Sequence, residues 1–114
     1  MIILYGIPNC DTVKKARAWL SERGLAYTFH DFKKHGVPPA QLARWTQAAG
    51  WEKLLNRKGT TWRQLDAAAQ AAVVDGASAQ SLMLANASAI KRPVVDWGDG
   101  ITVGFDAADW AGRV

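Results

Sequence analysis

The chain has 114 residues, of which 49% are hydrophobic and 21% are charged, a composition typical of one globular domain that buries its own core. No apolar run approaches the roughly 20 residues of a membrane-spanning helix, so no membrane association is expected. The formal net charge of +4 favours an anionic partner. The basic residues are scattered in pairs rather than gathered in a block, however, which argues against direct binding of nucleic acid.

The beginning of the chain predicts a strand, a helix and a second strand. Residues 1–5 form a short apolar run typical of a buried strand, and a turn over residues 6–9 separates it from a helix expected over residues 11–23. Alternating side chains over residues 26–32 predict the second strand. Two strands joined through a helix pair in parallel when they belong to one sheet.

The middle of the chain predicts helices and no strands. Residues 33–37 are expected to form a loop. Thr60 or Thr61 is expected to cap a helix, because short hydroxyl side chains accept hydrogen bonds from the first helical N–H groups. Helices are expected from the prolines at 38 and 39 to Gly50, from about Trp62, over the alanine-rich residues 65–74, and over residues 78–87.

The end of the chain predicts a hairpin and a last helix. Residues 94–97 and 101–105 are typical of antiparallel strands, because a Gly-Asp-Gly turn separates two runs rich in β-branched and aromatic residues. Asp106 is expected to cap a helix that ends at Arg113.

Cys10 is the only cysteine and lies where the first strand ends and the first helix begins. The N–H groups and the dipole of a helix N-terminus favour a thiolate over a thiol. Lys14 lies in the first turns of that helix, where the dipole disfavours cations, and this suggests a nearby anion. The alternative is that Cys10 is a small buried hydrophobic residue and Lys14 is solvated. A lone cysteine forms no disulfide within the chain, so a reducing cytoplasm is the expected location.

Five segments of the chain contain recognisable sequence motifs. They are Tyr5-Gly6-Ile7-Pro8-Asn9-Cys10-Asp11-Thr12-Val13-Lys14-Lys15-Ala16, Leu54-Leu55-Asn56-Arg57-Lys58-Gly59, Leu82-Met83, Ile90-Lys91-Arg92-Pro93-Val94 and Val103-Gly104-Phe105. In this order they resemble the arsenate reductase-like ArsC/Spx/YffB family, most of all its YffB-like branch. The resemblance implies an α/β, thioredoxin-like (glutaredoxin-like) fold with a mixed four-stranded sheet. It also implies a single domain over residues 1–114, in the order βαβ, helical insert at about 38–88, then ββα.

The resemblance also implies roles for individual residues. Cys10 matches the nucleophile of the family, Arg57 and Arg92 match two arginines that hold an oxyanion, and Pro93 matches a proline that follows a cis peptide bond. In such a fold the Pro93 loop faces Cys10 and brings Arg92 near the sulfur, while the helical insert carries Arg57. Asn9 is expected to serve as a turn residue, the alternative being a hydrogen bond to the sulfur.

Two departures from the family pattern bear on function. Arsenate reductases of this type carry a third arginine beyond the last strand, whereas this chain has none before Arg113. Spx-type regulators carry a Cys-x-x-Cys pair, whereas Val13 occupies the fourth position here, which excludes an intramolecular disulfide switch.

The expectation is therefore a monomeric, cytoplasmic thiol-disulfide reductase that binds no cofactor and uses glutathione as co-substrate. The Cys10 thiolate attacks a small oxidised thiol or an oxyanion, and an external thiol resolves the adduct. The alternatives are an Spx-like regulator that contacts RNA polymerase through basic residues and exposed tryptophans, an arsenate reductase proper, and a non-catalytic anion-binding domain. No metal site is expected, because His30 and His35 lack companions at ligand spacing.

Overall fold

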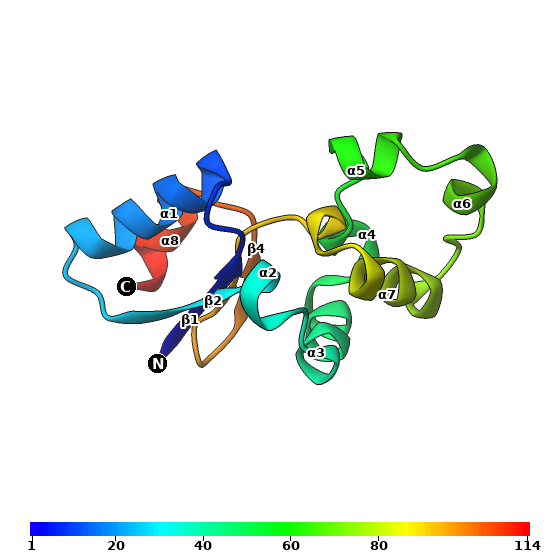
Figure 1. Cartoon of the computed structure of the whole chain (residues 1–114). Helices are drawn as coiled ribbons and strands as arrows, with labels where there is room; N and C mark the ends of the chain where they lie inside the picture. The colour runs from blue at the N-terminus through cyan, green and yellow to red at the C-terminus, as the bar shows by residue number, and fades with distance from the viewer. The chain divides into compact units, whose positions relative to one another are not determined.

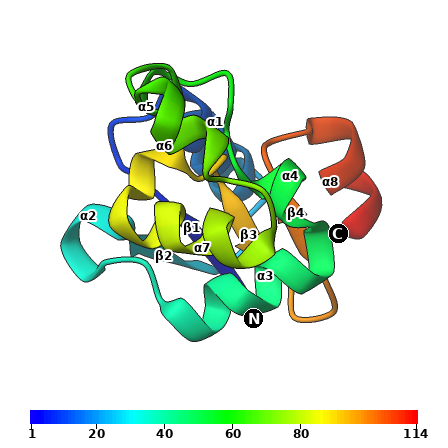
Figure 2. The same cartoon turned by 90° about the vertical axis from the view of Figure 1, so that its right-hand side faces the viewer.

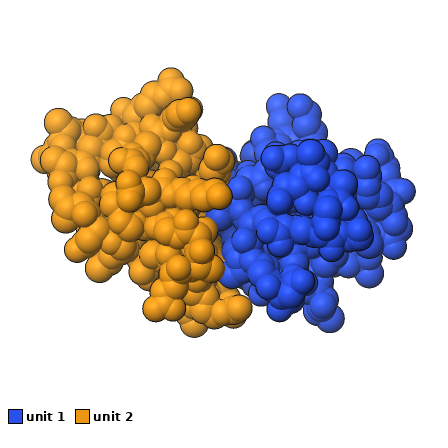
Figure 3. Space-filling view, turned by 180° about the vertical axis from the view of Figure 1, so that it is seen from behind, with its two compact units in different colours: residues 1–32, 92–114 blue, residues 33–91 orange.

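The computed structural model describes all 114 residues, which form two compact units. Unit 1 consists of residues 1–32 and 92–114, and unit 2 consists of residues 33–91 (Figure 3). The expected helical insert falls within unit 2. None of the helices combines the length and the apolar character that crossing a membrane requires.

Unit 1 contains a mixed four-stranded sheet and two helices (Figure 1). Its strands are β1 (Ile2–Gly6), β2 (Tyr27–Asp31), β3 (Val94–Asp96) and β4 (Ile101–Val103), and its helices are α1 (Asp11–Glu22) and α8 (Ala107–Arg113). The strand order is β2-β1-β3-β4, with β2 parallel to β1, β3 antiparallel to β1, and β4 antiparallel to β3. The predicted α/β class, the mixed four-stranded sheet and the βαβ and ββα halves are therefore confirmed.

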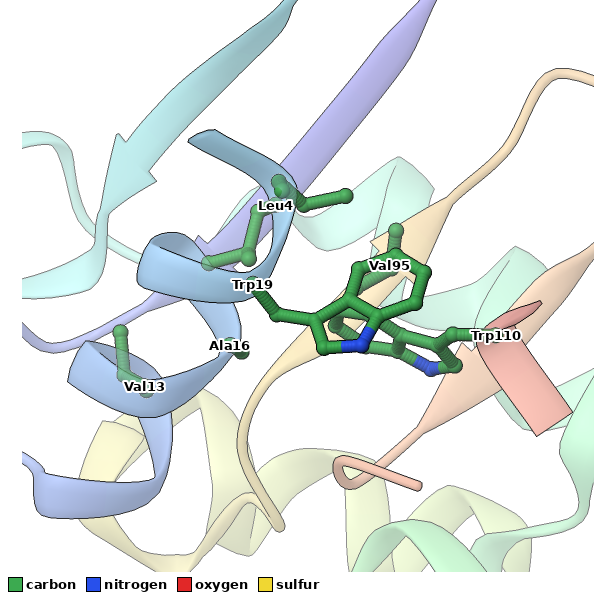
Figure 4. Packing of buried hydrophobic residues seen from close by; sticks show 7 residues of the cluster. Leu4, Val13, Ala16, Trp19, Val95 and Trp110 are labelled. Atoms are coloured by element: carbon green, nitrogen blue, oxygen red, sulfur yellow. The ribbon is translucent and has the colours of Figure 1, made fainter. Parts of the chain in front are cut away.

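The core of unit 1 holds α1 and α8 on one face of the sheet (Figure 4). Leu4 and Val95 extend from the sheet towards Trp19 of α1 and Trp110 of α8. The two indole rings meet edge to face, with centroids 5.6 Å apart, in a geometry that aromatic quadrupoles favour. This packing fixes α1, and therefore Cys10 at its N-terminus, on the sheet.

Unit 2 is helical. Its elements are α2 (Phe32–His35, which begins at the last residue of unit 1), α3 (Pro39–Ala49), α4 (Trp51–Leu54), α5 (Thr60–Arg63), α6 (Ala67–Ala71), α7 (Gly76–Ala85) and the 3₁₀ helix η1 (Ala87–Ala89). Helices α3, α4, α7 and η1 pack against one another (Figures 1 and 2). Its buried apolar side chains are Leu42, Trp45, Leu54, Leu55, Ala79, Met83, Ala89 and Ile90.

An isolated antiparallel bridge joins two distant segments of unit 2. Leu55 pairs with Ile90, the Asn56 N–H donates to the Ala89 carbonyl at 2.8 Å, and the Lys91 N–H donates to the Leu54 carbonyl at 2.8 Å. The backbone after α4 and the backbone after η1 are therefore held side by side.

Two local predictions for unit 2 are wrong. The loop expected over residues 33–37 is in part the single turn α2, because no proline or glycine interrupts the chain before Gly36, whose φ of 76° then ends the turn. Neither Thr60 nor Thr61 caps α5; Gly59 occupies the N-cap position and no side chain caps the helix.

Side-chain caps also change the bounds of the next two helices. Asp66 accepts a hydrogen bond from the Ala69 N–H at 2.7 Å and starts α6, so the helix is shorter than the expected 65–74. Asp75 and Ser78 form a reciprocal capping box, so α7 begins two residues before the expected Ser78.

Candidate functional site around Cys10

The turn between β1 and α1 is tight because Gly6 lies directly against α1. A Cβ atom on Gly6 would lie 2.8 Å from Cγ2 of Val13, so no larger residue fits there without displacement of that side chain. The Cys10 N–H closes the turn by donating to the Ile7 carbonyl at 3.3 Å. Ile7 is itself buried and anchors the turn. Cys10 is thereby held at a defined position beyond the carboxyl end of β1.

Cys10 is the N-cap residue of α1, with an extended backbone and a half-buried side chain. Its carbonyl accepts the first helical hydrogen bond, from the Lys14 N–H at 2.9 Å. The N–H groups of Thr12 and Val13, in the first turn of α1, interact with the sulfur.

The environment of Cys10 favours the thiolate. Burial acts to raise the pKa of the thiol, but it is outweighed by the Val13 N–H, the hydrogen bond and positive charge of Arg92, and the Thr12 N–H, so that the pKa lies below its ordinary value. A thiol with a lowered pKa is more often in the nucleophilic form at neutral pH.

The sheet topology brings Arg92 to the sulfur. Strand β3 is antiparallel to β1 with Val94 opposite Tyr5, so the residues before β3 lie beside those that follow β1. The Arg92–Pro93 peptide bond is cis, Pro93 is buried, and its carbonyl accepts the Gly104 N–H at 2.8 Å. The start of β3 and the residue after β4 thus hold the Arg92 loop next to Cys10.

Three other residues named from the sequence are not among the groups that shift the Cys10 pKa. Asn9 and Lys14 are exposed, and neither is among the groups that lower the Cys10 pKa. Arg57 belongs to unit 2, where its guanidinium lies 3.8 Å from Glu52 and 5.4 Å from the ring centroid of Trp51.

Arg113 lies at the other end of the sheet from Cys10. It pairs with Asp109 at 3.2 Å, and a Cβ atom on Gly100 would lie 3.6 Å from its Nη1. Gly98 of the same hairpin turn lies beside Met1, which precedes β1, whereas Cys10 follows β1. The five residues of β1 span about 16 Å. Arg113 therefore does not supply the third arginine of the site.

Four cationic side chains line a pocket of about 290 Å³ in unit 2: Lys53, Arg57, Lys58 and Lys91. Three of the four are close in sequence, but only the Leu55–Ile90 bridge brings Lys91 to them. No group of three or more histidine, cysteine, aspartate or glutamate side chains is arranged to hold a metal ion.

The fold and the site together define a class of protein. A four-stranded mixed sheet, a cysteine at the N-cap of the first helix and a cis-proline before the third strand are the arrangement of a thioredoxin-like protein. The family model described as the ArsC family matches residues 5–112. This chain belongs to the ArsC family and is arsenate reductase-like.

Individual relatives agree with this assignment over nearly the whole chain. A solved protein named YffB is 49% identical, covers 98% of this chain and 97% of its own, and superposes with a TM-score of 0.94. An arsenate reductase (ArsC) related protein from Brucella melitensis is 48% identical over 97% of this chain and 92% of its own, with a TM-score of 0.76. The global transcriptional regulator Spx of Streptococcus agalactiae is 28% identical over 111 residues, which are 93% of this chain and 77% of that protein.

Proposed function

We propose that this chain is a glutathione-dependent thiol-disulfide reductase with Cys10 as its nucleophile. The observation that carries the proposal is the lowered pKa of Cys10 beside Arg92, since the thiolate is the attacking species in disulfide exchange. The chain has no second cysteine, so a thiol from another molecule has to resolve the intermediate.

The reaction takes two exchange steps. The Cys10 thiolate attacks the glutathione sulfur of a mixed disulfide between glutathione and a substrate thiol; a Cys10–glutathione disulfide forms and the substrate thiolate leaves, to be protonated by water. The thiolate of a second glutathione then attacks the glutathione sulfur of that adduct. Oxidised glutathione leaves and the Cys10 thiolate is restored, so the net reaction converts the mixed disulfide and one glutathione into the free substrate thiol and oxidised glutathione.

Arg92 has two uses in this scheme. Its positive charge stabilises the Cys10 thiolate both as the attacking group and as the leaving group. Guanidinium also matches the geometry of a carboxylate through two parallel hydrogen bonds, so Arg92 is suited to bind a carboxylate of glutathione as it approaches the sulfur.

Reduction of arsenate is a second candidate, favoured by the similarity to the arsenate reductase (ArsC) related protein of Brucella melitensis. The position of Arg113 weighs against it, because the expected third arginine is missing from the neighbourhood of Cys10. Release of arsenite from arsenate in the presence of glutathione, at a rate comparable with that for a mixed disulfide, would favour this candidate instead.

A regulatory role is a third candidate, favoured by the similarity to Spx. One expectation behind it is wrong: none of the six tryptophans is fully exposed, since Trp19, Trp45 and Trp110 are buried and the other three are partly buried. Retention of purified RNA polymerase by the immobilised chain, with no turnover of mixed disulfides, would favour regulation over catalysis.

Mass spectrometry after exposure to oxidised glutathione tests the proposal. The expected result is one glutathione per chain, attached to Cys10, removed by reduced glutathione and absent in Cys10→Ser. Steady-state reduction of a small glutathione mixed disulfide should likewise require Cys10. A wild-type chain that forms no adduct at high oxidised glutathione would rule the proposal out.

A further inference from the structure

We propose that Phe105 is a specificity-determining residue of the Cys10 site, which selects mixed disulfides whose leaving thiol carries an apolar group. This role of Phe105 rests on the proposed reductase, and it goes further by naming the class of substrate that the site prefers. Cys10, Arg92 and Phe105 all belong to unit 1.

Strand pairing places Phe105 at the end of the sheet where α1 begins. Tyr5 of β1, Val94 of β3 and Val103 of β4 form one cross-strand row. The segments that follow β1, precede β3 and follow β4 therefore leave the sheet side by side. Because neighbouring strands lie about 4.8 Å apart, the segment after β4 lies about 10 Å from the segment after β1, with the Arg92–Pro93 segment between them.

Gly104 turns the Phe105 side chain onto the face of the sheet that carries α1 and α8. Side chains alternate along a strand, so a regular continuation of β4 would place Phe105 on the face of Val103, opposite the face from which Val95 contacts the helices. Gly104 has a φ of 85°, in the left-handed region that favours glycine, and interrupts this alternation. The Phe105 ring instead packs edge to face on Trp110, with centroids 4.8 Å apart.

Phe105 and Cys10 are both partly buried, and both pack against the core that α1 and α8 share. The ring of Phe105 therefore keeps some apolar surface in contact with solvent at the end of the sheet that holds the sulfur. A substrate that covers this surface gains the free energy of removing it from water. Small-molecule sites commonly combine apolar surface with a few polar groups, and here Arg92 supplies the charge.

A mixed disulfide between glutathione and an apolar thiol matches the three side chains. Its glutathione sulfur is the atom that Cys10 attacks, and a glutathione carboxylate pairs with the Arg92 guanidinium. The apolar group of the leaving thiol then covers the Phe105 ring. A small hydroxylated thiol leaves the ring in water and gains nothing from it, so aromatic and aliphatic thiols are preferred, including peptide cysteines next to apolar residues.

Alkylation of Cys10 tests the apolar contact without any need for turnover. N-methylmaleimide and N-benzylmaleimide add to the thiolate through the same double bond, with no leaving group, and differ in the apolar group alone. The benzyl-to-methyl ratio of second-order rate constants should exceed that of free glutathione about fivefold in wild type, the size expected of one aromatic contact. A change in the Cys10 pKa cancels in this ratio, because both reagents consume the same thiolate.

Three variants of Phe105 show whether the ring is the source of the preference. Phe105→Ala and Phe105→Gln should lower the ratio to that of glutathione, whereas Phe105→Leu, which keeps the apolar character, should retain most of it. A wild-type ratio equal to that of glutathione, or an unchanged ratio in Phe105→Gln, overturns the role of Phe105.

Trp97→Ala is the matched control for packing. Trp97 also packs edge to face on Trp110, with centroids 5.0 Å apart, but it precedes the hairpin turn at the other end of the sheet, where its N–H donates to the Gly100 carbonyl. Loss of either ring disturbs the same core, while only loss of Phe105 should lower the preference for the benzyl reagent. An equal loss of preference in Trp97→Ala would assign the effect to core packing and overturn a direct contact.

Steady-state turnover separates this role from the proposed reductase. The substrates are the glutathione mixed disulfides of benzyl mercaptan and of 2-mercaptoethanol, and Phe105→Gln should lower the ratio of their kcat/KM values about fivefold. A chain that turns over neither substrate but keeps the Phe105-dependent alkylation ratio would refute the reductase and support the apolar contact. An equal kcat/KM ratio in wild type and Phe105→Gln would support the reductase and overturn the selection by Phe105.

Discussion

At Cys10, burial and electrostatics act on the thiol in opposite directions. Half-burial raises the pKa, while two N–H groups of α1 and the guanidinium of Arg92 lower it, and the second effect is the larger. The N–H groups come from the backbone and are present with any sequence that forms the helix. The effect of Arg92 on the Cys10 pKa comes from its side chain, so a substitution can remove it.

Replacement of Arg92 by alanine should therefore raise the Cys10 pKa. The pH at which alkylation by iodoacetamide reaches half its maximal rate should move upwards, towards the value of an ordinary cysteine near 8.5. Arg113→Ala serves as a matched control, because it removes the same charge at the far end of the sheet. Equal shifts in the two variants would contradict a local role for Arg92.

The lowered pKa also predicts how stability depends on pH. Because the thiol is more acidic in the folded chain than in the unfolded chain, the thiolate stabilises the native state above the unfolded pKa, and this contribution is lost as the pH falls through the folded pKa. The free energy of unfolding of wild type, measured by urea denaturation relative to Cys10→Ser, should rise from acidic to alkaline pH. A difference that is flat or falls with pH would contradict the lowered pKa.

At the scale of elements, the close contact between β1 and α1 depends on Gly6, which has no side chain. Gly6→Ala places a methyl group 2.8 Å from Val13 and should destabilise the chain by about 1–3 kcal/mol through overpacking. Val13→Ala should relieve that clash, so the double variant should cost less than the sum of the single variants. Urea denaturation of all four proteins measures the coupling, and strict additivity would contradict the close approach.

The last helix depends on its N-cap. Asp106 accepts hydrogen bonds from the N–H groups of Ala108 and Asp109, so Asp106→Ala should cost about 1 kcal/mol in the free energy of unfolding. Asp99→Ala, in the exposed hairpin turn, removes the same charge without a cap and should be nearly neutral. Thermal or urea denaturation compares the two, and equal costs would show that charge rather than capping matters.

Element prediction succeeded where the local signal was strong. The apolar run that begins at Ile2 predicts a strand, and the Gly-Asp-Gly turn predicts a hairpin. Asp106 is a residue type that often caps helices, and the residues that follow it form a helix. Element prediction was wrong around Thr60 and over residues 33–37, where helices of a single turn form. Segments of four residues are too short for side-chain periodicity to distinguish a helical turn from a loop.

At the scale of the whole molecule, each unit has a buried tryptophan in its own core. Trp110 is 1% exposed in unit 1 and Trp45 is 0% exposed in unit 2, so replacement of either by alanine should cost about 3–5 kcal/mol. Amide hydrogen exchange should show Trp45→Ala lowering protection most over residues 33–91, and Trp110→Ala most in the remaining residues. An identical loss of protection throughout the chain in both variants would show that the units open together.

The sequence by itself determined the order of the elements, the class of the fold and the lone thiol at a helix N-terminus, because these depend on side-chain periodicity, turn residues and a cysteine count. Only the tertiary structure decided which cationic side chains lie close to Cys10 and which lie close to one another. The antiparallel pairing of β3 with β1 brings Arg92 to Cys10, the hairpin turn holds Arg113 at the other end of the sheet, and the Leu55–Ile90 bridge brings Lys91 to Lys53 and Lys58. These residues are far apart in the chain, and strand pairing rather than local pattern sets the distances between them.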